Sequence, residues 1–134
     1  MKKIFLLFIM ILLAACQSKM ITGETVNTSN GSYQNVTPRE LNSILKDKEF
    51  VLVNVHIPFA GNIAGTDQSI PYDRIEQNVS QLPADKKAKI VLYCRSGHMS
   101  QIAAEKLVSL GYTNVWNLKG GMIEWENAGF DLEK

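Results

Sequence analysis

This chain of 134 residues has few cysteines and histidines, and its net charge is close to zero. It contains two cysteines and two histidines, and its formal net charge is only +1. Such a balanced charge removes the main electrostatic argument for nucleic-acid binding, which needs a strongly basic face. Cys94, His56 and His98 show no metal-ligand spacing, so we expect no metal site. The length is that of one domain.

The one long apolar run is too short to cross a bilayer. Lys2 and Lys3 precede an apolar run over residues 4–13, whereas a membrane-spanning helix needs roughly 20 apolar residues. A short apolar run after positive charge is typical of a signal peptide. The run ends in Leu13-Ala14-Ala15-Cys16, which resembles the lipobox of bacterial lipoproteins, in which the cysteine is acylated after cleavage.

We therefore expect a signal peptide over residues 1–15, lipidation of Cys16, and an exported protein held on a membrane by this lipid anchor. A plain signal peptide and an uncleaved anchor are the alternatives. Removal of residues 1–15 takes away Lys2 and Lys3 and no acidic residue, so the formal net charge changes from +1 to −1. Lipidation would also leave Cys94 as a single thiol outside the cytoplasm, which suggests a use for its reactivity.

Residues 16–32 are expected to form the lipidated N-terminus and a flexible tether, because Ser, Thr, Asn and Gly dominate residues 17–32. The alternative is that a few of these residues pack loosely on the domain. The folded domain is expected to occupy residues 33–134.

Strand and helix patterns alternate along this domain. Residues 50–55 and 90–93 are almost continuously apolar, as in strands buried on both faces. Thr37, Pro38 and Glu40 predict a capped helix start. Further elements are expected as a short helix through Ile75 and Val79, a helix from the segment after Cys94 to Gly111, a strand at 115–116 and a helix at 122–128. The alternation predicts an α/β fold with a central, mainly parallel sheet flanked by helices.

Cys94 comes directly after the predicted strand 90–93. Ligands of open α/β sheets bind at the carboxyl ends of strands. The loop from Arg95 to Ser100 can curl so that backbone N–H groups face the sulfur, and the next helix adds its positive end. Gly97 permits the tight path. We predict that Cys94 is a thiolate nucleophile at neutral pH; an inert buried cysteine is the alternative.

The loop Cys94-Arg95-Ser96-Gly97 resembles the active-site loop of the rhodanese-like (sulfurtransferase) family, which begins Cys-Arg-x-Gly. Residues 110–115 and 118–125 are similar to the family's ending, LGY-NV--L-GG---W. The resemblance implies a three-layer rhodanese-like fold and a persulfide on Cys94, with no cofactor. The implied persulfide-binding loop comprises Arg95, Ser96, Gly97, His98, Met99 and Ser100.

The partners implied are a small sulfur-containing anion or persulfide donor and a thiol acceptor, which can be a protein. We expect the protein to be a monomer.

Two positions depart from the family pattern. Met99 stands where many members have arginine, which should weaken binding of a dianion such as thiosulfate, although protonated His98 could partly substitute. Asn54-Val55-His56 replaces Asp-x-Arg, so the ion pair that often braces the site cannot form in the usual way.

Two other functions are compatible with a cysteine in this setting. A cysteine phosphatase or arsenate reductase needs an arginine six residues after the cysteine, where this chain has Ser100. A persulfide carrier or thiol-redox partner that does not turn over needs no such arginine, and this alternative stays open.

Overall fold

The computed structural model describes residues 21–134; the predicted signal peptide and Cys16 lie outside the described residues. A six-stranded sheet has the order β1-β2-β6-β5-β3-β4. Its strands are β1 (Glu24–Thr28), β2 (Gly31–Val36), β3 (Val51–Asn54), β4 (Gln68–Ser69), β5 (Ile90–Tyr93) and β6 (Val115–Leu118). All neighbouring pairs are parallel except β1 and β2. The predicted α/β class with a mainly parallel sheet is confirmed.

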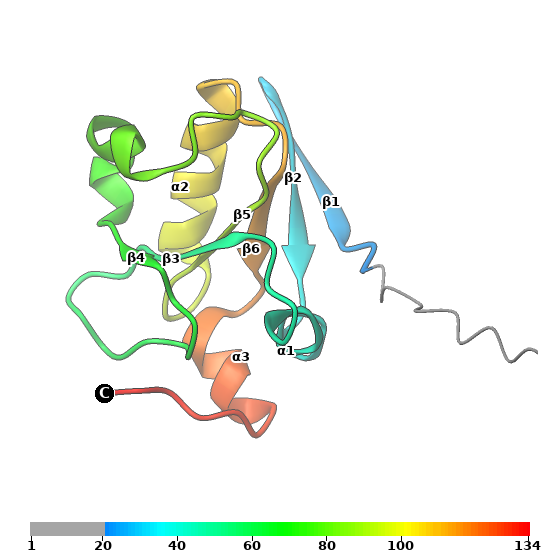
Figure 1. Ribbon diagram of the computed structural model, residues 1–134, viewed down its shortest axis with the longest axis vertical. Helices are drawn as coiled ribbons and strands as arrows, with labels where there is room; N and C mark the ends of the chain where they lie inside the picture. Colours follow the sequence, from blue (N-terminus) through cyan, green and yellow to red (C-terminus); the bar gives the residue numbers. More distant parts are fainter. Residues whose placement is uncertain (1–20) are drawn as a thin grey trace, which may run out of the picture.

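Helices cover both faces of the sheet (Figure 1). One face carries α2 (His98–Ser109) together with the short 3₁₀ helices η1 (Tyr72–Arg74) and η2 (Glu76–Gln81), and the other carries α1 (Pro38–Leu45) and α3 (Gly121–Asn127). In β5, Ile90 and Leu92 enter the core under α2, whereas Val91 and Tyr93 enter the core on the opposite face. The continuous apolar pattern of this strand therefore reflects burial on both sides, as predicted.

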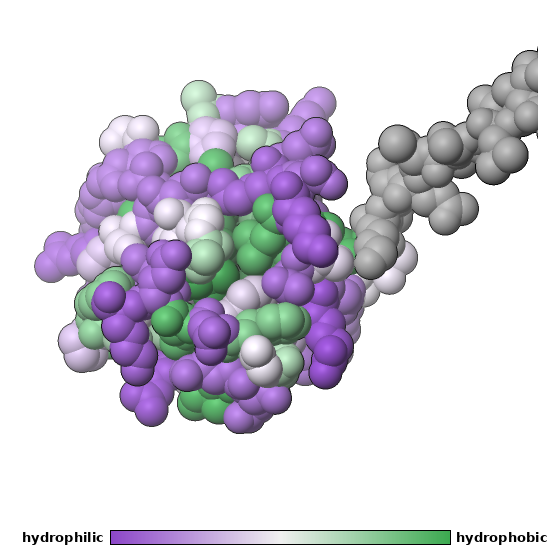
Figure 2. Space-filling model, turned by 60° about the horizontal axis from the view of Figure 1, so that its bottom comes forward, coloured by the Kyte–Doolittle hydropathy of each residue, from purple (hydrophilic) through white to green (hydrophobic). Residues whose placement is uncertain are grey.

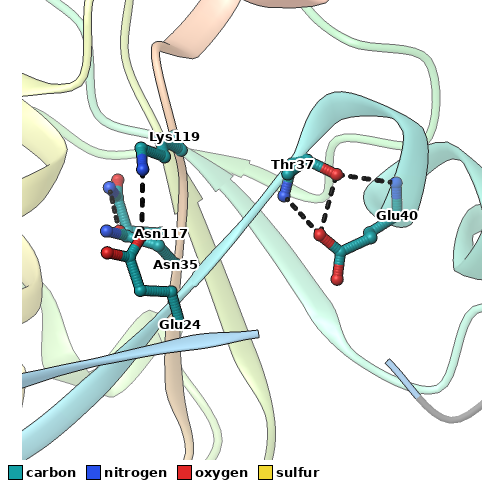
Figure 3. Close-up of polar contacts among 6 residues, drawn as sticks. All are labelled: Glu24, Asn35, Thr37, Glu40, Asn117 and Lys119. Carbon is teal, nitrogen blue, oxygen red and sulfur yellow. Dashed lines mark hydrogen bonds and ion pairs between the residues drawn. The ribbon is translucent and has the colours of Figure 1, made fainter. Parts of the chain in front are cut away.

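The start of α1 has the predicted capping box (Figure 3). The Glu40 N–H donates to Thr37 Oγ1 at 3.2 Å, and the Thr37 N–H donates to Glu40 Oε1 at 3.3 Å. Pro38 occupies the first turn, where its missing N–H has no intrahelical partner to lose. These contacts fix where the chain leaves β2 and place the buried Leu41 against the sheet.

The predicted tether is wrong for residues 24–32, because these residues form β1, the turn after it and the start of β2. Glu24–Thr28 pairs antiparallel with Gly31–Val36, with Val26 opposite Tyr33. Polar residues dominate the hairpin, and Val26 packs against the core under α2 from the edge strand. A half-exposed edge strand needs few apolar side chains, which explains why its composition looked like that of a linker. The part of the prediction that concerns residues 16–20 lies outside the described residues.

Trp116 and Trp125 both lie in the core under α1 and α3 and are 9% and 4% exposed. Between residues 21 and 134, no helix has the length and apolar character needed to cross a membrane.

Candidate active site

Cys94 is the first residue after β5, and its side chain is 1% exposed. The Gly97 N–H donates to Cys94 Sγ at 3.0 Å, and the Ser100 hydroxyl oxygen lies 3.4 Å from the same sulfur. Gly97 has φ +103°, a conformation that favours glycine, and α2 begins at the next residue. The sulfur therefore faces a backbone N–H and the N-terminal end of a 12-residue helix, both of which favour an anion.

The remaining loop side chains do not converge on the sulfur. Arg95, Ser96 and His98 are exposed, and Met99 is half-buried against the core under α2. Ser100 is fully buried and its hydroxyl donates to the Gly97 carbonyl at 3.1 Å. Of the six predicted loop residues, the structure thus brings Gly97 and Ser100 to the sulfur and leaves three at the surface.

The first turn of α3 donates backbone hydrogen bonds to the loop that begins at Cys94. The Met122 N–H donates to the Cys94 carbonyl at 2.9 Å, and the Ile123 N–H donates to the Arg95 carbonyl at 3.0 Å. Gly121 has φ +60°, and a Cβ at this position would overlap both carbonyl oxygens. Our sequence reasoning placed the Gly120-Gly121 pair in the family's ending but missed this contact. The signal available was a glycine pair between a strand and a helix.

Asn54 braces the neighbouring loop, which follows β3. Its buried side-chain amide donates to the Gly61 carbonyl and to Asn62 Oδ1, both at 2.9 Å, and its Oδ1 accepts from the His56 N–H at 3.0 Å. Where the family pattern has an ion pair, this chain therefore uses a neutral amide to hold the loop.

The hydroxyl of Tyr93 reaches the same loop from β5. It donates to Asn62 Oδ1 at 3.2 Å, accepts from the Ile63 N–H at 3.1 Å and lies 2.7 Å from Thr66 Oγ1. Burial raises the pKa of Tyr93, so its hydroxyl stays protonated at neutral pH. Asn62 also exchanges two backbone hydrogen bonds of 2.7 Å with Glu133. Sequence reasoning missed both contacts, because the partners are far apart in the chain.

A cavity of about 430 Å³ opens between this loop and the start of α3. Its lining combines apolar side chains with the charged residues Arg95, Lys134 and Glu126. The main apolar contributors are Phe59, Met122, Ile123 and Leu132. The pKa of His56 is lowered, first by burial and then by the Arg95 guanidinium, so His56 is neutral at neutral pH. Within residues 21–134, no three His, Cys, Asp or Glu side chains form a group that could hold a metal ion.

Comparison with known families matches residues 37–128 to the model of the rhodanese-like domain. The chain belongs to the rhodanese-like domain family. The match runs from the cap of α1 to the end of α3 and includes the Cys94 loop.

Relatives of this rhodanese-like domain include proteins named for sulfur transfer. A sulfurtransferase of Allochromatium vinosum is 33% identical over 100 residues, which cover 72% of this chain and 92% of the relative. The adenylyltransferase and sulfurtransferase UBA4 of Candida albicans is 34% identical over 69% of this chain and 23% of its own length. The chain spans about half or less of several curated relatives that it matches at 30–34% identity.

The solved structure of a thiosulfate sulfurtransferase from Pseudomonas aeruginosa has the same fold. Its TM-score is 0.65 at 27% identity, and the match covers 75% of this chain and 20% of that one. The rhodanese-like domain described here thus has sulfurtransferase-named relatives in both sequence and structure.

Proposed function

We propose that this chain is an exported sulfurtransferase that is anchored to a membrane through Cys16 and forms a persulfide on Cys94. The observation that carries the sulfur chemistry is the 3.0 Å hydrogen bond from the Gly97 N–H to Cys94 Sγ, at the carboxyl end of β5. The anchor is supported by the lipobox-like residues that end at Cys16.

The first step loads sulfur onto Cys94. The thiolate attacks the outer sulfur of a donor such as thiosulfate, a new S–S bond forms, and the donor's S–S bond breaks. Sulfite then leaves with the bonding electron pair. The Gly97 N–H and the start of α2 stabilise the negative charge, which is preorganised electrostatic stabilisation.

The second step passes the sulfur on. The thiolate of an acceptor, free or on a protein, attacks the outer sulfur of the persulfide, and the Cys94 thiolate leaves with the electron pair of the broken bond. The acceptor then carries the persulfide, and Cys94 is ready for another donor. Both steps use sulfur as nucleophile and leaving group, so neither calls for a cofactor.

Intact mass spectrometry of the full chain tests this proposal. After exposure to thiosulfate or to a polysulfide, we expect a gain of one sulfur atom that a reducing thiol removes. Cys94→Ser should abolish the gain with both donors. If the folded wild-type chain gains no sulfur from either donor, the proposal is wrong.

A persulfide carrier without turnover is the second candidate, and the position of Met99 favours it. This side chain packs half-buried against the core, at a site where many family members have arginine for the donor anion. Turnover of thiosulfate with cyanide, compared with one persulfide per chain, separates an enzyme from a carrier. If the missing cation limits the reaction, Met99→Arg should speed reaction with thiosulfate about tenfold or more, the value of one charge-assisted hydrogen bond.

A further inference from the structure

The described chain begins at the same edge of the sheet as Cys94. Strands β2, β6, β5 and β3 are parallel, so their carboxyl ends share one edge. Strand β1 is antiparallel to β2 and places Glu24 opposite Asn35, near the end of β2. Lys119, the first residue after β6, forms a 2.9 Å ion pair with Glu24 (Figure 3). The N-terminal side of the domain is therefore tied to the Cys94 edge.

Little chain separates this edge from the proposed anchor. Cys16 precedes Ile21 by five residues, which span at most about 18 Å when fully extended. Strands β1 and β5 are three sheet positions apart, or roughly 14 Å. A domain of this length is on the order of 30 Å across. A lipid on Cys16 would thus hold the Cys94 edge nearer the bilayer than the opposite edge.

The exposed apolar side chains gather at this edge as well. Within residues 21–134, four large apolar residues are exposed, and three of them, Ile57, Phe59 and Ile123, follow the carboxyl ends of β3 and β6. The fourth, Ile102, lies within α2. Phe59 is 62% exposed, and Phe59 and Ile123 line the cavity beside Arg95. Figure 2 turns this edge toward the viewer and shows apolar surface between the polar side chains. Exposed apolar side chains that share one cavity lining, as Phe59 and Ile123 do, are candidates for a contact surface.

We propose that the Cys94 edge is the membrane-facing surface of the anchored protein, with Ile57, Phe59 and Ile123 in contact with the lipid interface. It follows that Cys94 exchanges sulfur with thiols or persulfides carried at the membrane. This inference rests on the lipid anchor of the proposed function. Three apolar side chains are a weak membrane contact alone, but the anchor raises their local concentration at the bilayer, so that the contact fixes an orientation.

The charged side chains at this edge do not favour anionic over zwitterionic lipid. Acidic and basic side chains are mixed there, namely Glu24, Glu124, Glu126, Arg95, Lys119 and Lys134. Contact should therefore be apolar in origin and should occur on zwitterionic phosphatidylcholine, with little dependence on salt.

Depth-dependent fluorescence quenching tests the orientation. The full chain is isolated from membranes as wild type, as Phe59→Trp and as Ser29→Trp, and each is reconstituted into phosphatidylcholine vesicles with brominated acyl chains. Ser29 lies in the exposed β1–β2 turn at the opposite edge. After subtraction of wild-type emission, we expect at least twofold quenching of the tryptophan at position 59 and none at position 29.

Equal quenching at both positions, or none at position 59, would overturn the proposal. The exposed apolar residues at this edge would then be assigned to contact with a protein partner.

Intact mass and vesicle flotation report the anchor separately, and a chain without acyl groups would overturn the orientation together with the anchor. Persulfide formation on Cys94 from polysulfide, measured on the wild-type chain in the same vesicles, reports the sulfur chemistry separately. Circular dichroism spectra that match wild type show that each variant is folded.

Discussion

The loops that follow β5 and β3 lie at the same edge of the sheet but are held in different ways. The loop after β5 is short, and main-chain groups hold it: the N–H groups of Gly97, Met122 and Ile123 contact its sulfur or its carbonyls. The loop after β3 is longer, and the side chains of Asn54 and Tyr93 hold it. The reactive loop thus depends mainly on close backbone approach, whereas its neighbour combines the two backbone hydrogen bonds between Asn62 and Glu133 with a few specific polar side chains.

The largest expected effect comes from blocking the backbone approach. Gly121→Ala places a methyl group against the Cys94 and Arg95 carbonyls at φ +60°, so we expect a loss of about 3 kcal/mol in the free energy of unfolding. Persulfide formation should fall with it. Gly111→Ala is the matched control, because Gly111 has φ +94° but nothing within 4 Å; we expect a loss of about 1 kcal/mol there. Equal losses in denaturant titrations would show that close approach is unimportant.

The next effect concerns the side-chain brace. Asn54→Asp keeps the acceptor for the His56 N–H but removes both donated hydrogen bonds and turns a carboxylate toward the Gly61 carbonyl and Asn62 Oδ1. We expect a loss of about 2 kcal/mol in unfolding free energy. Asn78→Asp, which removes a similar bond at the surface, should change it by less than about 0.5 kcal/mol. An unchanged midpoint for Asn54→Asp would mean that the brace is dispensable.

A smaller effect is expected from the hydroxyl beside the sulfur. Ser100→Ala removes the group 3.4 Å from Cys94 Sγ, so the rate of alkylation at pH 7 should fall about fivefold, equivalent to about 1 kcal/mol. Ser109→Ala on the same helix removes a comparable hydroxyl bond, to the Lys106 carbonyl, far from the sulfur. The Ser109 variant should react like wild type. If both variants do, the Ser100 hydroxyl plays no part in stabilising the thiolate.

The smallest expected effect is the electrostatic influence of Arg95 on the pKa of His56. Burial and the Arg95 cation lower the pKa of His56, so Arg95→Gln should raise this pKa, measured by NMR titration of the imidazole. A lowered pKa means that the unfolded chain takes up the proton first, so stability should fall as pH drops below about 6.5. That fall should be shallower in the variant. No change in the His56 titration would place Arg95 too far away to act.

Patterns that depend on neighbouring residues were predictable from the sequence. The buried strand 90–93, the Thr37–Glu40 cap and the position of Cys94 between strand and helix all follow from local spacing. Contacts between distant residues were not predictable. The sequence pattern predicts Tyr93 only as one more apolar residue of a buried strand. In the structure, its hydroxyl forms hydrogen bonds with Asn62 and Ile63, about 30 positions earlier in the chain. Strand β1 was missed because its polar side chains suit an edge strand and a linker equally well.

The replacement of an ion pair by the Asn54 amide has a consequence for the environments in which the site keeps its shape. Dissolved ions screen the attraction between a carboxylate and a guanidinium, and acid removes the carboxylate's charge altogether. An amide and a protonated phenol offer nothing for ions to screen and no charge for acid to remove. The loop after β3, which forms one wall of the cavity beside Arg95, is therefore expected to keep its hydrogen bonds to Asn54 and Tyr93 at both high and low salt concentration.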